Sequence, residues 1–415
     1  MNQWTVLIYA NGNNELEPEV YKRFVELEKE NFKDKINILV QIGRGNRDLI
    51  NILRQQVNLK DTIKQWEGVR RYEIRESKFN LIQDLGSINM ASPENFAEFV
   101  IWGIKKYPLS KIMVIISGHG AGFIGLMTDY TQEKPYMMDI FGLTNSLYNI
   151  KANTGRSIDC LVLDACFMNM VEVWNEIALI SNKPVKYLFA PSKNLKLEGL
   201  SYSLIVKSIV SKFTIRRSLK ETIKIYNANF KKDGQLLLVD LNKKYFNLLY
   251  KEIDHISKIL SEKNIDLRPL LYKWCLFKPI DPLISLLDLK CLLEKYNINN
   301  KLMSILNNII ICPELTDIHY RINEGPSLYL PLNLTQYLEL RYYYDSLLFI
   351  QENNWSKIVG GPGNFVPRKN IKKNYFELVP PIIIPLYYVV ATILDQNPEI
   401  SDKEAWEIVR TVWEE

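Results

Sequence analysis

Short apolar runs recur along the first 240 residues, and most of them are rich in β-branched residues. Runs of this kind, bounded by turn residues, predict buried strands. They lie at Thr5–Tyr9, Ile36–Gln41, Arg71–Ile74, Ile112–Ile116, Ile158–Leu163 and Tyr187–Phe189. Helical periodicity fills the gaps, for example over Pro18–Asn31 and over Pro93–Lys106, where Ser92 is a suitable N-cap. This alternation predicts an α/β fold whose mostly parallel central sheet is covered by helices on both faces.

The pattern changes beyond residue 242. Gln235–Leu241 and Ser327–Leu332 indicate two added strands, and residues 243–310 between them carry Leu, Ile and Lys at helical spacing. Gly360–Gly363 is typical of a linker, and Ser401–Glu404 forms a capping box that opens a last helix. We therefore expect four parts: an α/β core over 1–242, a helical insert over 243–318, a return to the sheet domain over 319–359, and a proline-rich apolar strap with a C-terminal helix over 360–415.

One apolar segment, Leu378–Leu394, carries no charge over 17 residues. It is short for a membrane span, and Pro380, Pro381 and Pro385 would disrupt a spanning helix. We therefore expect no membrane contact. An apolar segment must still be covered, so we predict that residues 360–415 dock on the rest of the chain or on a regulatory protein partner.

Composition and charge narrow the function classes. The 415-residue chain is 47% hydrophobic and 24% charged, as is ordinary for a globular protein. Its net charge is only +5 and its basic residues form no stripe with aromatic residues, so we expect no nucleic-acid binding. Five cysteines without a Cys-x-x-Cys pair favour neither a disulfide framework nor a zinc site. With no signal peptide before the first strand, we expect a cytoplasmic protein, while a secreted mature form stays open.

Two of the predicted strands end in residues that can do covalent chemistry. One runs into Ser-Gly-His-Gly, which contains His119, and a later one runs into Asp-Ala-Cys, which contains Cys166. The carboxyl ends of parallel strands meet at one edge of a sheet, where ligands bind. An imidazole there can activate a thiol and protonate a leaving amine, and adjacent glycines let backbone N–H groups approach an oxyanion. The alternative is an inert buried cysteine and a histidine that only caps its strand.

Several segments of the chain resemble the clostripain family of cysteine peptidases, in the caspase-like clan of gingipains and legumains. The most specific of them is Asp164–Val173, around the cysteine. The others are Trp4–Tyr9 with Asn13–Pro18, Arg70–Tyr72, Asp84–Met90, Ser117–Gly125 with Asp129, Gly325–Pro331, and Trp355. The resemblance implies a caspase-like three-layer α/β/α sandwich and a cysteine endopeptidase that acts on protein or peptide substrates.

The resemblance also implies roles for the matching residues. Cys166 matches the nucleophile and His119 the general base and acid, while the backbone N–H groups of Gly120 and Cys166 match the oxyanion hole. Asp164 matches an acid near the floor of the primary specificity pocket, and a carboxylate there favours Arg or Lys before the scissile bond. Because residues two apart on a strand point to one face, Asp164 can lie beside Cys166. The alternative for Asp164 is a cap for the next helix.

The segment after the following strand departs from the family pattern. Lys193 stands where an acid is usual, and Leu200 stands where a tryptophan is usual. We expect Ser192, Lys193 and Glu198 to line the substrate site, with one altered wall and a less strict preference for Arg or Lys. Glu198 is the candidate that compensates for Lys193.

Two other functions stay open on the sequence. Gly120–Gly125 matches the Gly-x-Gly-x-x-Gly pattern of dinucleotide sites, although it follows a middle strand and no amphipathic helix pattern follows it. The second alternative is a regulated, non-catalytic binding module on a caspase-like scaffold. We expect no cofactor and no metal, because the chain has no Asp-rich loop of the EF-hand kind, while the resemblance leaves a calcium requirement open.

Overall fold

The computed structural model describes most of the chain and the whole predicted sheet. The described residues are 4–30, 32, 36–54, 66–75, 78–192, 195–209, 214–230, 235–267, 286–288, 292, 300–311, 326–331, 334–351, 353–360, 383–397 and 399–413. Lys193 and much of the predicted helical insert and strap lie outside these residues.

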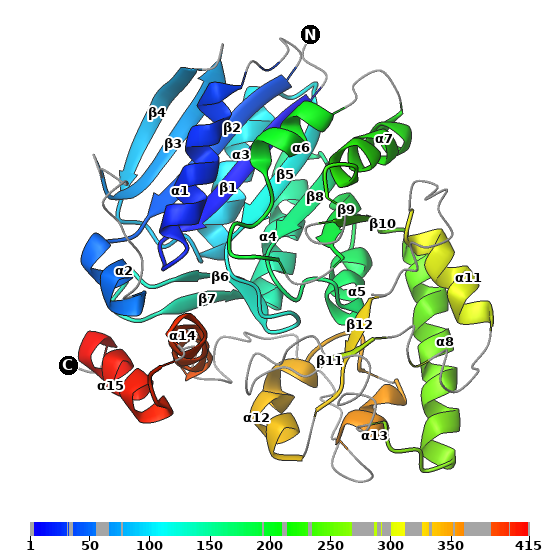
Figure 1. Cartoon of the computed structure of the whole chain (residues 1–415). Coiled ribbons are helices and arrows are strands. Elements are labelled where there is room, and N and C mark those ends of the chain that lie inside the picture. Colours follow the sequence, from blue (N-terminus) through cyan, green and yellow to red (C-terminus); the bar gives the residue numbers. More distant parts are fainter. Residues whose placement is uncertain are drawn as a thin grey trace.

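An eight-stranded sheet forms the centre of the described chain, in the order β10-β9-β8-β5-β1-β2-β3-β4 (Figure 1). The strands are β1 (Trp4–Gly12), β2 (Ile36–Arg44), β3 (Gly68–Arg75), β4 (Lys78–Gly86), β5 (Lys111–Ser117), β8 (Ile158–Asp164), β9 (Val185–Pro191) and β10 (Leu236–Asp240). The five from β9 to β2 are parallel, and β10, β3 and β4 join antiparallel at the edges. The mostly parallel α/β sheet is thus confirmed.

Alternation along the central strands sends side chains into two separate cores. In β1, Leu7 and Tyr9 pack into one core, whereas Val6 and Ile8 pack into the other, and all four are fully buried. A strand buried on both faces has no place for charge, which explains the uncharged β-branched runs in the sequence.

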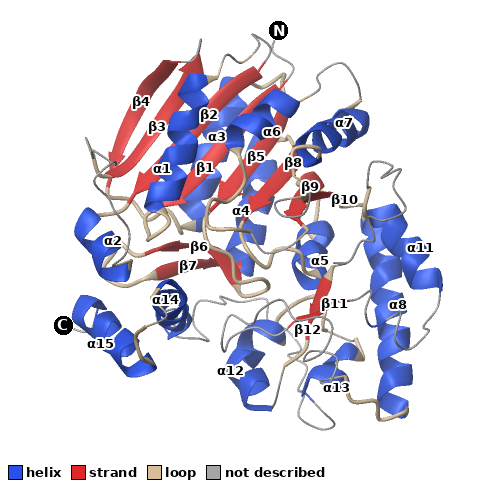
Figure 2. Cartoon of the chain, viewed as in Figure 1, coloured by secondary structure: helices blue, strands red, loops and turns tan. Residues whose placement is uncertain are grey.

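Helices cover both faces of the sheet, as the figure coloured by secondary structure makes clear (Figure 2). One face packs on α3 (Pro93–Lys106), α4 (Ile140–Thr154) and α5 (Val171–Leu179). The other packs on α1 (Glu17–Glu26), which continues into the 3₁₀ turn η1 (Leu27–Lys29), and on α6 (Tyr202–Ser208) and α7 (Ile215–Asn227). The Ser92 hydroxyl accepts a hydrogen bond from Asn95 N at 3.2 Å, so the predicted cap of α3 is confirmed.

The later part of the chain adds helices beside the β10 edge (Figure 1). Its described elements are α8 (Lys243–Glu262), β11 (Leu286–Asp288), α11 (Asn300–Ile309), β12 (Ser327–Tyr329), α12 (Leu334–Tyr344) and α13 (Trp355–Gly360). β11 pairs antiparallel with β12 and was not predicted. The division into an insert and a returning segment stays a prediction.

The last two helices pack on the sheet domain. Val389 and Ile393 of α14 (Ile383–Gln396) and Val409 of α15 (Asp402–Trp413) share a buried cluster with Leu53, the last residue of α2 (Arg47–Leu53), and with Tyr130. In Figure 1 both helices lie beside α2, below the hairpin of β6 (Gly125–Asp129) and β7 (Tyr136–Asp139). None of the described helices combines the length and apolar character that a bilayer span requires.

The capping box at the start of α15 is also confirmed. The hydroxyl of Ser401 accepts from Glu404 N at 3.3 Å, and the Glu404 carboxylate accepts from Ser401 N at 2.7 Å. Two backbone donors at the helix start are thereby satisfied.

The hairpin β6–β7 overturns the dinucleotide alternative. Gly125, the last glycine of the pattern, begins strand β6 and pairs with Asp139 of β7, so no helix N-terminus follows the glycines to bind a pyrophosphate. The glycines serve close packing instead, since a Cβ on Gly125 would lie 2.2 Å from the Met138 carbonyl oxygen.

Candidate active site

The ends of β5 and β8 bring the two predicted catalytic loops to one edge of the sheet. Ser117 at the end of β5 pairs in parallel register with Asp164 at the end of β8. His119 and Cys166 each follow two residues later. One more backbone bond, from Gly118 N to the Asp164 carbonyl at 3.2 Å, continues the pairing into the loops.

The two loops touch at Gly120. A Cβ built on this glycine would lie 2.2 Å from the Cys166 carbonyl oxygen and 3.0 Å from the Cys166 nitrogen. Real Cβ contacts are never this short, so only glycine lets the histidine loop pack against the cysteine backbone. The sequence analysis expected these glycines to let backbone N–H groups approach an oxyanion, and it did not predict the contact between the loops.

Glu15 holds the imidazole of His119. Its Oε1 lies in short hydrogen-bond contact with His119 Nε2, and the Glu15 side chain is only 1% exposed. Glu15 follows β1, the strand next to β5, and its backbone carbonyl accepts from Arg54 Nη1 at 2.9 Å. The contact engages one ring nitrogen, Nε2, and holds the orientation of the imidazole.

The sequence analysis missed Glu15 as a functional residue. A signal was present, because Glu15 also follows the carboxyl end of a parallel strand, as His119 and Cys166 do. Its polar neighbours obscured this signal, since Asn11 at the end of β1 and Asn13 and Asn14 in the same loop are also buried.

The thiol of Cys166 is half-buried beneath the loop that follows β9. Its Sγ donates to the Leu195 carbonyl oxygen at 3.7 Å. The next residue, Phe167, has a φ of 59°, in the left-handed region, so the chain turns sharply after the cysteine. Cys160, the other cysteine among the described residues, is buried in β8, where burial raises the pKa of its thiol well above the ordinary value.

Asp164 lies at the same edge, but its carboxylate is already paired. Oδ1 accepts from Leu200 N at 2.7 Å, and Oδ2 accepts from the Ser117 hydroxyl at 2.6 Å. Oδ2 also forms a short ion pair with Nη1 of Arg23 in α1. The sequence analysis did not identify this arginine as part of the site.

The capping alternative for Asp164 is wrong. Helix α5 has Met170 as its N-cap residue, with no side-chain cap. All the side-chain partners given above for Asp164 lie outside α5, because the carboxylate points toward α1 and the loop before α6 rather than toward the following helix.

The other predicted substrate-binding residues lie in the segment after β9. The Ser192 carbonyl oxygen accepts from Asn169 Nδ2 at 3.1 Å, which ties this segment to the cysteine loop. Glu198 is exposed, and Lys193 lies outside the described residues. A role in substrate binding stays a prediction for all three.

A buried carboxylate, that of Asp129, forms hydrogen bonds to the loop that follows β1. Asp129, at the end of β6, accepts from Met90 N at 2.6 Å and from Asn13 Nδ2 at 2.7 Å. Burial raises the pKa of Asp129, and hydrogen bonds from Thr131 and Asn13 act against that rise. Since Asn13 lies two residues before Glu15, this network fixes the loop that carries the partner of His119.

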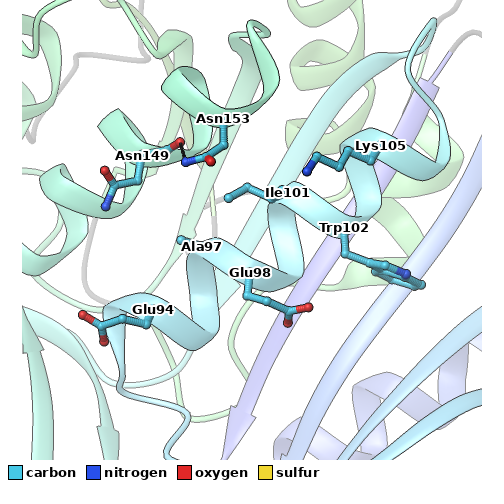
Figure 3. A pocket seen from close by; sticks show the side chains of 8 residues that line it. All are labelled: Glu94, Ala97, Glu98, Ile101, Trp102, Lys105, Asn149 and Asn153. Carbon is cyan, nitrogen blue, oxygen red and sulfur yellow. Dashed lines mark hydrogen bonds between the residues drawn. The ribbon is translucent and has the colours of Figure 1, made fainter.

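A shallow pocket of about 640 Å³ lies elsewhere, between α3 and α4 (Figure 3). It is lined by Glu94, Ala97, Glu98, Ile101, Trp102, Lys105, Asn149 and Asn153, none of which belongs to the edge described above. Within the described parts of the chain, no three His, Cys, Asp or Glu side chains gather as metal ligands.

Comparisons with known proteins agree with this architecture. The model of the clostripain family matches residues 8–361. A secreted C11 cysteine protease from Bacteroides thetaiotaomicron, solved with an irreversible peptide inhibitor, is 15% identical with a TM-score of 0.60 over 84% of this chain and 98% of that chain. An inactive zymogen C11 protease from Parabacteroides distasonis is also 15% identical with a TM-score of 0.60, over 84% and 97%. No curated protein sequence matches.

The structural likeness establishes the fold, which is the caspase-like sandwich of C11 proteases. The family match spans the sheet, the paired loops that carry His119 and Cys166, and the helices up to α13. The chain therefore belongs to the clostripain family of cysteine peptidases.

Proposed function

We propose that Cys166 and His119 are the catalytic dyad with which this cysteine endopeptidase cleaves peptide bonds. The observation that supports this most is the contact of the two strand-end loops at Gly120, which no other residue could make. A thiol and an imidazole at one edge of a parallel sheet are the groups needed for covalent acyl transfer.

The proposed reaction uses these two side chains, two backbone N–H groups and water. His119 accepts the thiol proton, and the Cys166 sulfur attacks the carbonyl carbon of the scissile bond. The N–H groups of Gly120 and Cys166 stabilise the oxyanion. The imidazolium then protonates the leaving amine as the C–N bond breaks, which leaves a thioester on Cys166. Water, deprotonated by His119, attacks the thioester and releases the acid and the thiol.

Glu15 is a positioning residue in this proposal. Its carboxylate holds one ring nitrogen of His119 and is placed to stabilise the imidazolium that forms in each half-reaction. Because its side chain is almost fully buried, the interaction is shielded from water.

Fluorogenic peptides turned over by purified wild type and variants test the dyad. Cys166→Ala and His119→Ala should abolish turnover, whereas Cys160→Ala, a matched change of the buried cysteine in β8, should keep it. Full turnover by Cys166→Ala would refute the proposal. Tight capture of a peptide by the wild type without cleavage would favour the binding-module alternative.

The expected preference for Arg or Lys depends on one interaction. A basic substrate side chain gains from Asp164 only if the carboxylate is free to bind it. Arg23 now holds that carboxylate, together with Ser117 and the backbone of Leu200. The preference stays a prediction, and Arg23 is the residue that decides it.

The compartment, the cofactors and the partners of the enzyme are also matters of proposal. We propose a cytoplasmic enzyme without a resident metal, to be tested by cell fractionation and by activity in the presence of a calcium chelator. Helices α14 and α15 pack on Leu53 and Tyr130. This packing supports the proposal that the apolar residues of 360–415 are buried against the rest of the chain rather than against a regulatory partner.

A further inference from the structure

The guanidinium of Arg23 pairs with Asp164, the carboxylate that is expected to meet a basic substrate side chain. It reaches across from α1, with Nη1 paired to the carboxylate and Nη2 3.3 Å from the Ser117 hydroxyl. Its Nε donates to the Glu19 carbonyl oxygen at 3.3 Å, and the group lies over the Tyr202 ring at 4.7 Å. Each guanidinium nitrogen therefore has a partner inside the protein.

Both members of this ion pair are buried. The Arg23 side chain is 8% exposed and the Asp164 side chain 1%. Burial alone lowers the pKa of Arg23, but the charge of Asp164, the nearby Tyr202 and the hydrogen bond to Asp164 outweigh it, so the net effect raises this pKa. The guanidinium of Arg23 therefore stays charged.

The loop before α6 is shaped around this arginine. Gly199 has a φ of 62°, and a Cβ on it would lie 2.2 Å from Arg23 Nη1. The next residue, Leu200, donates its N–H to Asp164 and has its carbonyl oxygen 3.4 Å from Nη1. At the other end of the same loop, the Leu195 carbonyl oxygen accepts from the catalytic thiol. The loop that contacts Arg23 is thus the same loop that contacts the thiol of Cys166.

We infer that Arg23 is a specificity-determining residue that turns the primary pocket away from basic side chains, so that this enzyme cleaves after uncharged residues. The inference rests on the proposed dyad and replaces the expected preference for Arg or Lys. A substrate cation would have to share Asp164 with Arg23 at close range or leave Arg23 buried without its partner. Either outcome costs free energy that an uncharged side chain does not.

The test uses four peptides that differ only before the scissile bond: Arg against citrulline, and Lys against norleucine. Citrulline keeps the shape of Arg without its charge, and norleucine is Lys without its ammonium group. For the wild type we expect kcat/KM for the basic member to be no higher than for its neutral partner. Arg23→Ala frees the carboxylate and opens space beside it, so both ratios should rise about tenfold or more. Lys22→Gln removes an exposed charge from the same helix and should leave both ratios unchanged.

A preference of the wild type for Arg or Lys of about tenfold or more would overturn the inference, and this result needs no variant. Ratios that stay the same in a folded Arg23→Ala protein would also overturn it. If that variant does not fold, Arg23→Gln, which keeps most of the side-chain length, should move the ratios in the same direction.

A binding measurement separates this inference from the dyad. Agmatine, a small guanidinium compound, should raise the melting temperature of Arg23→Ala but not that of the wild type or Lys22→Gln. This readout does not depend on turnover, so an inactive wild type with the expected agmatine response would refute the dyad alone. Active enzymes without that response would refute the role of Arg23 alone.

Discussion

Glu15 and His119 meet only because the loops after β1 and β5 are neighbours at one edge of the sheet. Glu15→Gln keeps the shape of the side chain and removes its charge. We expect kcat to fall roughly 10- to 100-fold, as for other partners that orient a functional histidine, with KM little changed because Glu15 does not contact substrate. Glu15→Asp should recover part of kcat, and Glu28→Gln on the exposed surface should change nothing. An unchanged kcat in Glu15→Gln would remove Glu15 from the mechanism.

Gly120 is the residue on which the loop contact depends. Gly120→Ala puts a methyl group against the Cys166 carbonyl and should separate the loops, so we expect kcat/KM to fall roughly 100-fold or more. Gly155→Ala is the comparison, because its φ of 66° is strained for alanine but nothing lies within 4 Å of the added carbon. That variant should lose about 1 kcal/mol of stability and keep its activity. Equal activity in both variants would contradict the close packing.

Residue types at strand ends could be predicted, but their partners could not. Apolar runs stop where His119 and Cys166 begin, and glycines beside them indicate a close approach, so this part of the site follows from local pattern. Glu15 and Arg23 look like ordinary polar residues of a loop and a helix. The pairing of Glu15 with His119 and of Arg23 with Asp164 depends on how α1 packs against the loops at this edge of the sheet. The pattern of a single sequence does not encode that packing.

Helix α5 links the catalytic loop to the later part of the chain through two buried carboxyls. Glu172 accepts from Tyr329 N at 2.8 Å and from the Tyr344 hydroxyl at 3.0 Å, and burial raises its pKa to about 7. Glu176 accepts from Phe349 N at 3.1 Å, and burial raises its pKa to about 8, with a further rise from the charge of Glu172. Both therefore bind protons more tightly in the folded than in the unfolded chain.

A pH dependence of stability follows from these directions. The ordinary pKa of a glutamate is 4.5, so as the pH rises above this value the unfolded chain releases these protons first. The free energy of unfolding should therefore fall between about pH 4.5 and 8 and level off above that range. Glu176→Gln imitates the protonated form and should reduce this fall by roughly 1–3 kcal/mol in urea unfolding. Glu133→Gln is the exposed control, and a slope that Glu176→Gln leaves unchanged would contradict the assignment.

At the scale of elements, strands with a continuous apolar run were predictable and strands without one were not. β1, β5 and β8 are buried on both faces, and their apolar runs stand out in the sequence. β4 is an edge strand with mostly exposed residues, and β6–β7 is a short hairpin whose first strand begins in the glycine pattern. Neither has a continuous apolar run, since β4 is mostly exposed and the buried residues of β6 include Gly125, Thr128 and Asp129.

At the scale of the whole molecule, the C-terminal helices extend the sheet domain beyond the part that the family model matches. Ile393 of α14 is fully buried against Leu53 and Tyr130, and Asn397 Nδ2 donates to the Leu53 carbonyl at 3.2 Å. Pro385 falls in the first turn of α14, where a missing N–H costs no helical bond, so the apolar segment could form a helix there despite its prolines. The sequence predicted that this segment must be covered but not by which surface, since an apolar stripe fits many.

Detaching these helices tests whether the docking stabilises the sheet domain. Ile393→Asp buries a charge without a partner and should cost roughly 2–5 kcal/mol, with faster amide hydrogen exchange in α14, α15 and α2. Lys403→Asp, on the exposed side of α15, should leave both measurements as in the wild type. Faster exchange confined to α14 and α15 would mean that the pair lies on α2 without supporting it.

The most direct test of the central claim is the mass of the intact protein after reaction with an irreversible, cysteine-directed peptide inhibitor. The wild type and Cys160→Ala should each gain one inhibitor, and the modified residue should be Cys166. His119→Ala should react at least about 100-fold more slowly, because the thiol loses its base. Cys166→Ala should gain nothing. Labelling of Cys166→Ala at the wild-type rate, or equal rates in the wild type and His119→Ala, would contradict the dyad.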